Sequence, residues 1–567
     1  MEAFGPWRLI LAAIFAGFLH FQGSCSSDAA PNYTFMQEAT NAPPVSFYDY
    51  IIIGGGTAGC PLAATLSQNF RVLLLERGGS PYGNQNITNL ATYVDTLTDT
   101  SPTSPAQSFV SEDGVVNTRA RVLGGGTCLN AGFYSHADPE FVQKAGLDLD
   151  LVNRSYEWVE KVMVFEPQLR QWQSAVRKGL LEVGVLPDNG YTFYHIYGSK
   201  VGGFIFDKDN HRHTAVDLLQ YANPSRLTVL LHATVHRILF KTEGQSKPAA
   251  HGVIFKDGAG NEHRAYLSKE KGKGSMSEII VSAGALGSPQ LLILSGIGPA
   301  QHLKSLGIKV LLDQPMVGQG MADNPMNFIV VPSPSPVEIS LAQQVGITRL
   351  GTYIEAVSRI DFVRFFGLTT PTNETTPETT KSALETIERL QNAGMIFEKT
   401  IGPVSTGYLK LRNRNPDDNP MVTFNYFKEP EDLQRCINGM KILEGVVNSK
   451  AFSNFRYPNV TVEALLNMAQ YLVKNLQPER SNASTFESLE QYCKDTVVTI
   501  WHYHGGCQVG RVVDHQYRVL GVDSLRVIDG STFIDSPGTN PQATLLMLGR
   551  YMGIKMRNAR LGRNDLD

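Results

Sequence analysis

The sequence predicts an α/β fold with a Rossmann-like domain at its centre. Two observations lead to this prediction: a short β-branched run at 48–53 enters a glycine-rich turn, and a second apolar run follows at 71–75. Gly is also in excess, at 52 of 567 residues, which is about 9% against a usual ~7%. The length allows three to four units of ~150 residues, or fewer where one large ligand-binding unit takes up much of the chain.

The first turn runs from Gly54 to Gly59 and fits the pattern G-x-G-x-x-G. Its first Gly permits a tight turn, its second lets the backbone approach a pyrophosphate, and its third lets helix and strand pack closely. The helix that follows directs free N–H groups at the phosphates. Glu76, 22 residues after Gly54, ends the next strand, where it can bind a ribose diol. This order predicts dinucleotide binding, and an acid at 76 disfavours a 2′-phosphate.

Two more glycine-rich segments suggest backbone brought close to a ligand. One spans 120–132 and contains three consecutive glycines followed by Thr127; the other spans 282–298 and follows a strand-like run at 278–281. Taken alone, either segment is equally well explained as a buried turn.

The overall charge excludes two classes of protein. The chain has 50 Lys and Arg against 53 Asp and Glu, so its formal net charge is −3. A nucleic-acid-binding protein is expected to carry a basic patch or stripe, and a strongly acidic chain is expected to be disordered. Neither description fits, so no nucleic-acid partner is expected.

The N-terminus is typical of a secretory signal peptide, predicted at residues 1–25. An apolar run at 9–19 is too short for a bilayer span of ~20 residues, and small residues follow it at 23–27. An uncleaved membrane anchor at the same segment is the alternative. No later stretch is apolar enough to span a membrane, so no span is expected in the mature chain. Six N-x-S/T sequons agree with export to the extracellular space or cell wall, at Asn32, Asn86, Asn153, Asn373, Asn459 and Asn482.

The six cysteines contain no C-x-x-C pair, so a zinc ribbon is not expected. Cys60 and Cys128 follow or lie within glycine-rich turns, and we expect both to be small buried thiols. Cys436 and Cys493 lie in the C-terminal half. Export through an oxidising compartment makes a disulfide between them reasonable, and two free thiols are the alternative.

Four ordered segments of the sequence resemble the glucose–methanol–choline (GMC) oxidoreductase family. They are the first turn, RVLGGGTCLNAG, GALGSPQLLILSGIG, and a C-terminal pair of motifs around 501–510 and 538–542. The resemblance covers about 49–553. It implies an FAD-binding domain from 46–325 and 500–567, with an inserted substrate domain at 326–499 that contains an antiparallel sheet.

The resemblance also implies which residues surround a bound FAD. Asn130 and Ala131 are expected beside the isoalloxazine ring, and the Val235 backbone is expected at the adenine end. In some members a His just before the Asn binds the flavin covalently, but Leu129 occupies that position here, which predicts non-covalent FAD. The expected cofactor-binding set is Gly54, Gly56, Thr57, Ala58, Gly59, Glu76, Arg77, Gly125, Thr127, Asn130, Ala131, Val235, Trp501, His502, Asp529, Gly530, Asn540, Pro541 and Gln542.

His502 and Asn540 are the predicted catalytic pair. Alcohol oxidation removes the hydroxyl proton and transfers the carbinol hydride to flavin N5, and His takes up a proton near neutral pH because its ordinary pKa is ~6.5. Asn540 is expected to orient the substrate oxygen. His504 shares a strand face with His502, but no third ligand stands at a familiar metal spacing, so no metal is predicted.

The string WHYHGG resembles the plant branch of the family that holds hydroxynitrile (mandelonitrile) lyases and HOTHEAD-like proteins. The lyase pattern has His where this chain has Asn540, and Cys where it has Glu355. These departures favour an FAD-dependent oxidoreductase acting on alcohols, including long-chain hydroxy fatty acids. A lyase that uses FAD without redox chemistry, and a catalytically silent FAD-binding cell-wall protein, are the two alternatives. The physiological alcohol, the electron acceptor and the oligomeric state stay open.

Overall fold

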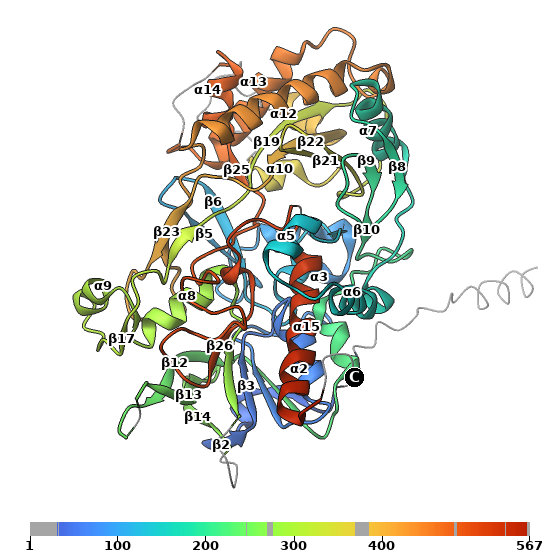
Figure 1. Cartoon of the computed structure of the whole chain (residues 1–567). Coiled ribbons are helices and arrows are strands. Elements are labelled where there is room, and N and C mark those ends of the chain that lie inside the picture. The colour runs from blue at the N-terminus through green and yellow to red at the C-terminus, as the bar shows by residue number, and fades with distance from the viewer. Residues whose placement is uncertain are drawn as a thin grey trace, which may run out of the picture.

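The computed structural model describes residues 31, 33–244, 246–268, 276–368, 385–480, 485–538 and 540–563. The predicted signal peptide and the sequons at Asn32, Asn373 and Asn482 lie outside these ranges. The described chain has a lower half built on a parallel sheet and an upper half built on an antiparallel sheet (Figure 1). Both the α/β class and the inserted antiparallel sheet are therefore confirmed.

The lower half is organised around a six-stranded sheet in which every neighbouring pair is parallel. Its order is β1 (Met36–Glu38), β11 (Leu227–Leu231), β4 (Val72–Leu75), β3 (Tyr50–Ile53), β15 (Glu278–Val281) and β26 (Leu525–Val527). The last strand comes from the C-terminal part of the chain, which thus completes the sheet begun at the N-terminus.

Both faces of this sheet are covered, which explains why its central strands are apolar throughout. Ile52 and Leu74 pack toward helices α2 (Gly59–Leu66), α6 (Leu149–Met163) and α15 (Gln542–Leu561). Ile51 and Leu73 pack on the other side, among residues of α8 (Gly284–Leu294) and a second sheet. That sheet has the order β12 (Thr234–Lys241), β13 (Ala249–Lys256), β14 (Glu262–Leu267) and β2 (Val45–Tyr48).

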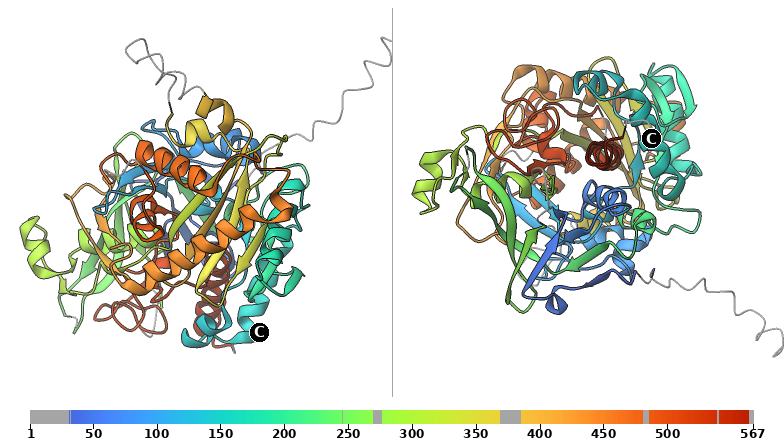
Figure 2. Two further views of the ribbon diagram at one scale, coloured as in Figure 1. Left: turned by 90° about the horizontal axis from the view of Figure 1, so that it is seen from above. Right: turned by 60° about the horizontal axis from the view of Figure 1, so that its bottom comes forward.

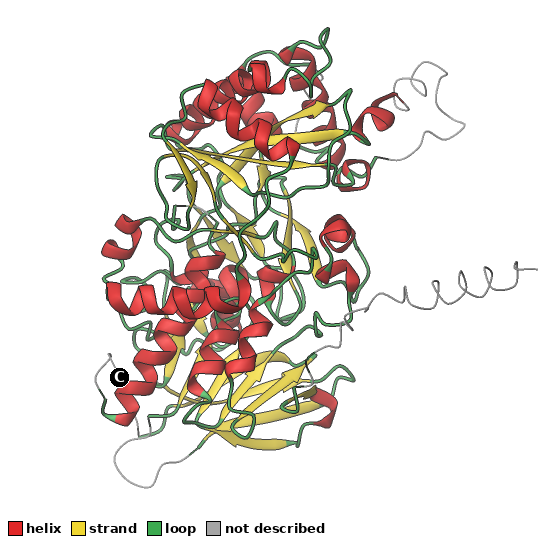
Figure 3. Cartoon of the chain, turned by 90° about the vertical axis from the view of Figure 1, so that its right-hand side faces the viewer, coloured by secondary structure: helices red, strands yellow, loops and turns green. Residues whose placement is uncertain are grey.

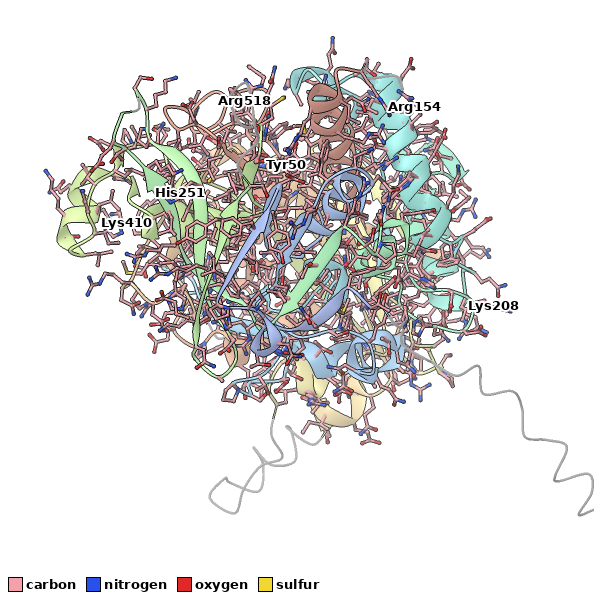
Figure 4. The ribbon with its side chains drawn as sticks, turned by 90° about the horizontal axis from the view of Figure 1, so that it is seen from below. Tyr50, Arg154, Lys208, His251, Lys410 and Arg518 are labelled. Carbon is pink, nitrogen blue, oxygen red and sulfur yellow. A yellow bond between two sulfur atoms is a disulfide. The ribbon has the colours of Figure 1, made fainter. Side chains whose placement is uncertain are left out.

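Charged side chains lie around the outside of this lower half. Seen from below, Tyr50 of β3 lies near the middle, whereas Arg154, Lys208 and Lys410 lie toward the rim (Figure 4). Tyr50 is 2% exposed. The parallel sheet thus forms the interior of this half.

The upper half contains a seven-stranded sheet. Its order is β25 (Val498–Thr499), β19 (Pro325–Pro332), β22 (Ala393–Thr400), β21 (Thr352–Ser358), β20 (Gln344–Ile347), β9 (Gly198–Val201) and β8 (Asp188–Tyr191). All neighbouring pairs are antiparallel except β8 with β9. The domain boundaries at 325/326 and 499/500 stay predictions, and β8 and β9, from the first predicted interval, join the sheet of the second.

Helices cover the outer face of the upper sheet. α12 (Pro430–Asn448), α13 (Val462–Leu476) and α14 (Leu489–Thr496) cross above its strands, with α7 (Gln171–Glu182) beside them (Figures 1 and 2). In the side view of Figure 3 these helices lie over the strands, so the opposite face of the sheet is turned toward the lower half. Cys436 of α12 and Cys493 of α14 form a disulfide, so that possibility is confirmed.

The remaining described elements are short. β5 (Ala106–Val110) pairs with β6 (Val116–Ala120), β7 (Phe133–Tyr134) with β10 (Gly203–Phe204), and β16 (Ile297–Gly298) with β17 (Leu312–Asp313). β18 (Gln319–Met321), β23 (Gly407–Lys410) and β24 (Met421–Thr423) form a small sheet. The short helices are α3 (Gln85–Thr88), α4 (Tyr93–Leu97), α5 (Pro139–Lys144), α9 (Ala300–Ser305) and α10 (Phe362–Phe365). Among the helices described, none has both the length and the apolar composition needed to cross a bilayer.

Candidate active site

One cavity brings together most of the residues expected to bind a dinucleotide. It is lined at one end by Glu76 and Val235, along its length by the three glycine-rich segments, and at the other end by His502 and Asn540. All of the predicted cofactor-binding residues line it except Gly59 and Thr127.

Those two residues hold the backbone of the turns in place. A Cβ at Gly59 would lie 2.0 Å from the carbonyl oxygen of Gly54, so only Gly permits this helix to pack against the turn. The Thr127 hydroxyl donates to the carbonyl of Gly124 at 2.7 Å and accepts from the N–H of Ala215 at 3.0 Å. Gly59 and Thr127 therefore shape the wall of the cavity without lining it.

The first turn requires glycine for two physical reasons. Gly54 has φ +103°, and a Cβ there would lie 2.3 Å from the carbonyl oxygen of Ser282 in the third glycine-rich segment. A Cβ at Gly125 of the second segment would lie 2.8 Å from the Cα of Gly56. The three segments, distant in sequence, thus meet backbone to backbone and form one wall.

Acidic side chains fix this wall. Glu76 accepts hydrogen bonds from the backbone N–H groups of Gly55, at 3.0 Å, and Gly78, at 2.8 Å, and burial raises its pKa. Asp529 accepts from the N–H of Gly284 at 2.9 Å and from the hydroxyl of Ser288, and burial raises its pKa as well.

At the other end, a buried carboxylate positions the backbone of His502. The His502 N–H donates to Oδ1 of Asp323 at 2.8 Å, while the hydroxyls of Thr499 and Tyr426 donate to Oδ2, each at 2.6 Å. Burial raises the pKa of Asp323 to about 6. Trp501, the residue before His502, has φ +60°, a left-handed conformation that turns the chain sharply at the cavity wall.

The imidazole of His502 is held neutral by its surroundings. Burial lowers its pKa well below the ordinary value of 6.5, and the nearby positive charge of Lys399 lowers it further. Its Nδ1 atom is buried and has no hydrogen-bond partner among the described residues. A neutral imidazole with a free ring nitrogen at a cavity wall is suited to accept a proton from a ligand.

Asn540 is anchored from behind. Its Oδ1 accepts a hydrogen bond from the Lys399 ammonium at 2.9 Å, and the same ammonium donates to Oε1 of Glu355 at 3.0 Å. Glu355 lines the cavity, whereas the ammonium lies 4.2 Å from the centroid of the Tyr353 ring.

Beyond His502 the cavity is walled by apolar side chains of the upper sheet, of α10 and of the connection between β21 and α10. They are Met326, Val357, Ile360, Phe365, Met395 and Phe397. We call this part the apolar chamber. Its residues follow the period of two in β21 and β22: Val357 and Phe397 face the chamber, whereas Ile354 and Ile396 lie in the core beneath the helices.

Sequence reasoning missed Asp323, Lys399 and the apolar chamber. Lys399 follows Glu398 at the end of an apolar strand, which hints at buried charges, but the sequence does not say which of the two faces the cavity. No sequence signal marked Asp323. His504 does not line the cavity; its Nδ1 lies 3.1 Å from the carbonyl oxygen of His502, and the described residues contain no group of side chains arranged to hold a metal ion.

Comparison with known proteins identifies the family. The profile of the GMC oxidoreductase N-terminal part matches residues 48–326 and that of its C-terminal part matches 403–549. The chain is 53% identical over 536 residues to Protein HOTHEAD of Arabidopsis thaliana, covering 91% of this chain and 89% of that protein. It is 48% identical over 534 residues to an (R)-mandelonitrile lyase-like protein of the same plant, covering 93% of each.

A third relative is an alcohol oxidase by name. Sinalpyl alcohol oxidase Nec3 of Nesocodon mauritianus is 42% identical over 563 residues, covering 97% of this chain and 96% of that protein. Among solved structures, formate oxidase from Aspergillus oryzae superposes with a TM-score of 0.72 at 19% identity, covering 92% of this chain and 99% of that one. At that identity the structural match supports the fold alone.

The residues of the cavity fit the FAD that this family uses. The backbone at Gly284, with φ +79°, has open space where a Cβ would stand, and Gly54, Gly56 and Gly125 line the cavity without a side chain between backbone and ligand. The buried, unpaired ring nitrogens of Trp501 and His502 are polar atoms that a bound ligand can satisfy. The chain therefore belongs to the GMC oxidoreductase family and is an FAD-dependent oxidoreductase.

Proposed function

We propose that this enzyme oxidises an alcohol with a large apolar body to the corresponding carbonyl compound, with His502 as the base. The observation that supports this is that His502 and Asn540 line the same cavity as the apolar chamber. An alcohol whose apolar part fills the chamber presents its hydroxyl to these two polar side chains. Burial of apolar surface then supplies the binding free energy, at ~25 cal/mol per Å².

His502 takes the hydroxyl proton of the substrate. Its lowered pKa keeps the ring neutral at physiological pH, so a ring nitrogen has a lone pair available. Asn540 hydrogen-bonds the substrate oxygen and fixes its orientation, and the apolar chamber excludes water from the reacting carbon. Bound FAD supplies the acceptor for the carbinol hydride, so the alcohol loses one proton and one hydride.

The apolar chamber supports a substrate class within this reaction. Its walls carry aliphatic, thioether and phenyl groups, which suit an alkyl or aryl chain. HOTHEAD, with 53% identity, and the alcohol oxidase Nec3 are the relatives that agree with this assignment. Long-chain hydroxy fatty acids are the candidate substrates that we place first.

Two features weigh against hydroxynitrile cleavage. The lyase pattern has a His where Asn540 stands and a Cys where Glu355 stands, and Glu355 is bound to Lys399 here. A catalytically silent role is weakened by the retention of both His502 and Asn540 at the cavity.

The decisive experiment is anaerobic mixing of the purified flavoprotein with 1-decanol, an ω-hydroxy fatty acid, cinnamyl alcohol and mandelonitrile. Bleaching of the flavin absorbance by an alcohol supports the proposal. Cyanide release from mandelonitrile without bleaching by any alcohol would overturn it in favour of the lyase. A His502→Ala variant that keeps the full rate of bleaching would overturn the assignment of the base.

We also propose that the protein is exported and N-glycosylated. The sequons at Asn86, Asn153 and Asn459 are exposed, and the Cys436–Cys493 disulfide suits an oxidising compartment. Expression in a plant host is expected to deliver the protein to the apoplast without residues 1–25. Treatment with a peptide N-glycosidase is expected to lower its mass, and an unchanged mass would contradict the glycosylation.

A further inference from the structure

A buried ion pair lies directly behind Asn540. The Lys399 side chain is 0% exposed and that of Glu355 is 1% exposed. The Lys399 ammonium has two hydrogen-bond acceptors in the structure, Oε1 of Glu355 and Oδ1 of Asn540. Two charges withdrawn from water in this way cost free energy, and replacing such a pair by apolar residues is often neutral or stabilising. Stability alone therefore does not explain why the pair is here.

The sheet brings the pair to this position. Lys399 of β22 lies opposite Tyr353 of β21, and Glu355 is two residues further along β21 on the same face. That face carries Phe397 and Val357 of the apolar chamber. Asn540 comes from the C-terminal segment, 141 residues after Lys399, so the contact joins the upper sheet to the segment that precedes α15.

The chemistry of the contact determines which way the carboxamide of Asn540 points. A lysine ammonium has three donors and no acceptor, so only the oxygen of the carboxamide can face it. The NH₂ group is then the part of the carboxamide that remains for the cavity. Glu355 holds the ammonium in place, because a charge-assisted hydrogen bond between buried groups has a defined geometry.

We propose that Lys399, held by Glu355, is a positioning residue that fixes Asn540 as a hydrogen-bond donor toward the substrate oxygen. The inference rests on the proposed function, in which Asn540 contacts that oxygen. A fixed NH₂ donor stabilises the negative charge that develops on the oxygen as His502 removes the proton, and it continues to bind the carbonyl oxygen of the product. Without Lys399 the carboxamide is free to rotate and present its oxygen, which repels the substrate oxygen.

The test is a double-mutant cycle on the purified flavoprotein, using the alcohol that bleaches the wild-type flavin fastest. Asn540→Ala is expected to slow flavin reduction about 100-fold, and Lys399→Met by a comparable factor. In the Asn540→Ala background, Lys399→Met is expected to slow flavin reduction by less than about a further threefold, because both changes remove the same interaction. Two outcomes would overturn the inference. One is a double variant in which the rate losses of the two single variants multiply in full, and the other is a Lys399→Met variant as fast as wild type.

Binding of the corresponding aldehyde gives a readout that does not depend on turnover. A carbonyl oxygen only accepts hydrogen bonds, so its affinity for the oxidised enzyme reports on the donor at Asn540. We expect Lys399→Met to weaken aldehyde binding about tenfold, measured by perturbation of the flavin spectrum. Unchanged affinity in Lys399→Met together with weakened binding in Asn540→Ala would overturn the role of Lys399 and leave the proposed function standing.

Two further variants control for damage to the fold. Lys399→Met leaves the Glu355 carboxylate buried without its cation, so the combined Glu355→Gln and Lys399→Met variant is made as well, and it is expected to fold and to show the same two losses. Glu398→Gln is the matched control, since Glu398 is the strand neighbour of Lys399 and its side chain packs against α12. It is expected to keep wild-type rates and aldehyde affinity. If Asn540→Ala itself reacts at the wild-type rate, the proposed role of Asn540 fails, which separates that outcome from a failure of Lys399 alone.

Discussion

The backbone N–H of His502 donates a 2.8 Å hydrogen bond to the carboxylate of Asp323, a residue 179 positions earlier in the chain. This contact ties the segment around His502 to the turn between β18 and β19. Asp323 also accepts hydrogen bonds from two hydroxyls, so both of its carboxylate oxygens serve as acceptors.

Replacement of Asp323 by Asn is therefore expected to disturb the position of His502. The amide nitrogen of Asn cannot accept the hydrogen bonds that Thr499 and Tyr426 donate, so that side of the site must rearrange. We expect flavin reduction to slow about tenfold while FAD content is retained. Tyr426→Phe, which removes one of the donors to Asp323, is the control and is expected to have a smaller effect. A wild-type rate in Asp323→Asn would show that the contact does not position His502 for the proposed proton transfer.

The rate of flavin reduction is expected to fall as the pH is lowered through about 6, the raised pKa of Asp323. Above this pH the carboxylate is ionised and accepts all three hydrogen bonds; below it, protonation removes acceptor capacity. Burial lowers the pKa of His502 well below 6.5, so its ring is neutral at the upper end of this range. Stopped-flow measurements between pH 4.5 and 8 test this, and in Asp323→Asn the decline near pH 6 is expected to disappear. A decline that persists there unchanged would contradict the assignment.

FAD is expected to leave the protein on denaturation. Leu129 lines the cavity next to Asn130 and has no nucleophilic atom with which to form a bond to the flavin. After precipitation with acid, the yellow colour should remain in the supernatant. Flavin that stays with the precipitate would contradict the prediction.

Glu398 is expected to make the stability of the fold depend on pH. Both of its oxygens are buried without a hydrogen-bond partner in the described chain, and burial raises its pKa well above the ordinary value of 4.5. The folded state therefore keeps a proton that the unfolded state releases above pH ~4.5, so the free energy of unfolding falls as the pH rises from that value.

Glu398→Gln removes this dependence, because the amide mimics the protonated acid. The variant is expected to be more stable than wild type at pH 8 and close to it at pH 4.5. Urea unfolding at the two pH values measures the difference. Equal midpoints for the two proteins at pH 8 would show that the carboxyl group is not held protonated.

The sequence by itself determined the dinucleotide-binding segment. The strand at 50–53, the turn from Gly54 and the acid at 76 follow one another within a single unit, and each step has a local physical cause: β-branched residues favour the strand, and only Gly adopts φ +103° at no cost. The resemblance to the GMC family likewise rested on contiguous motifs. Such features can be read in order because the residues that make them are neighbours in the chain.

The tertiary structure alone decided what surrounds His502 and Asn540. Asp323, Glu355 and Lys399 lie in three separate segments, and nothing in their local sequence says that they meet. In a strand such as 393–400 every second residue shares a face, but this segment has no apolar–polar alternation that says which face turns toward the cavity. The pairing register of β21 with β22, and the packing of α12 against one side, made that choice. Lys399 was thereby placed against Asn540, and Glu398 was buried beneath a helix.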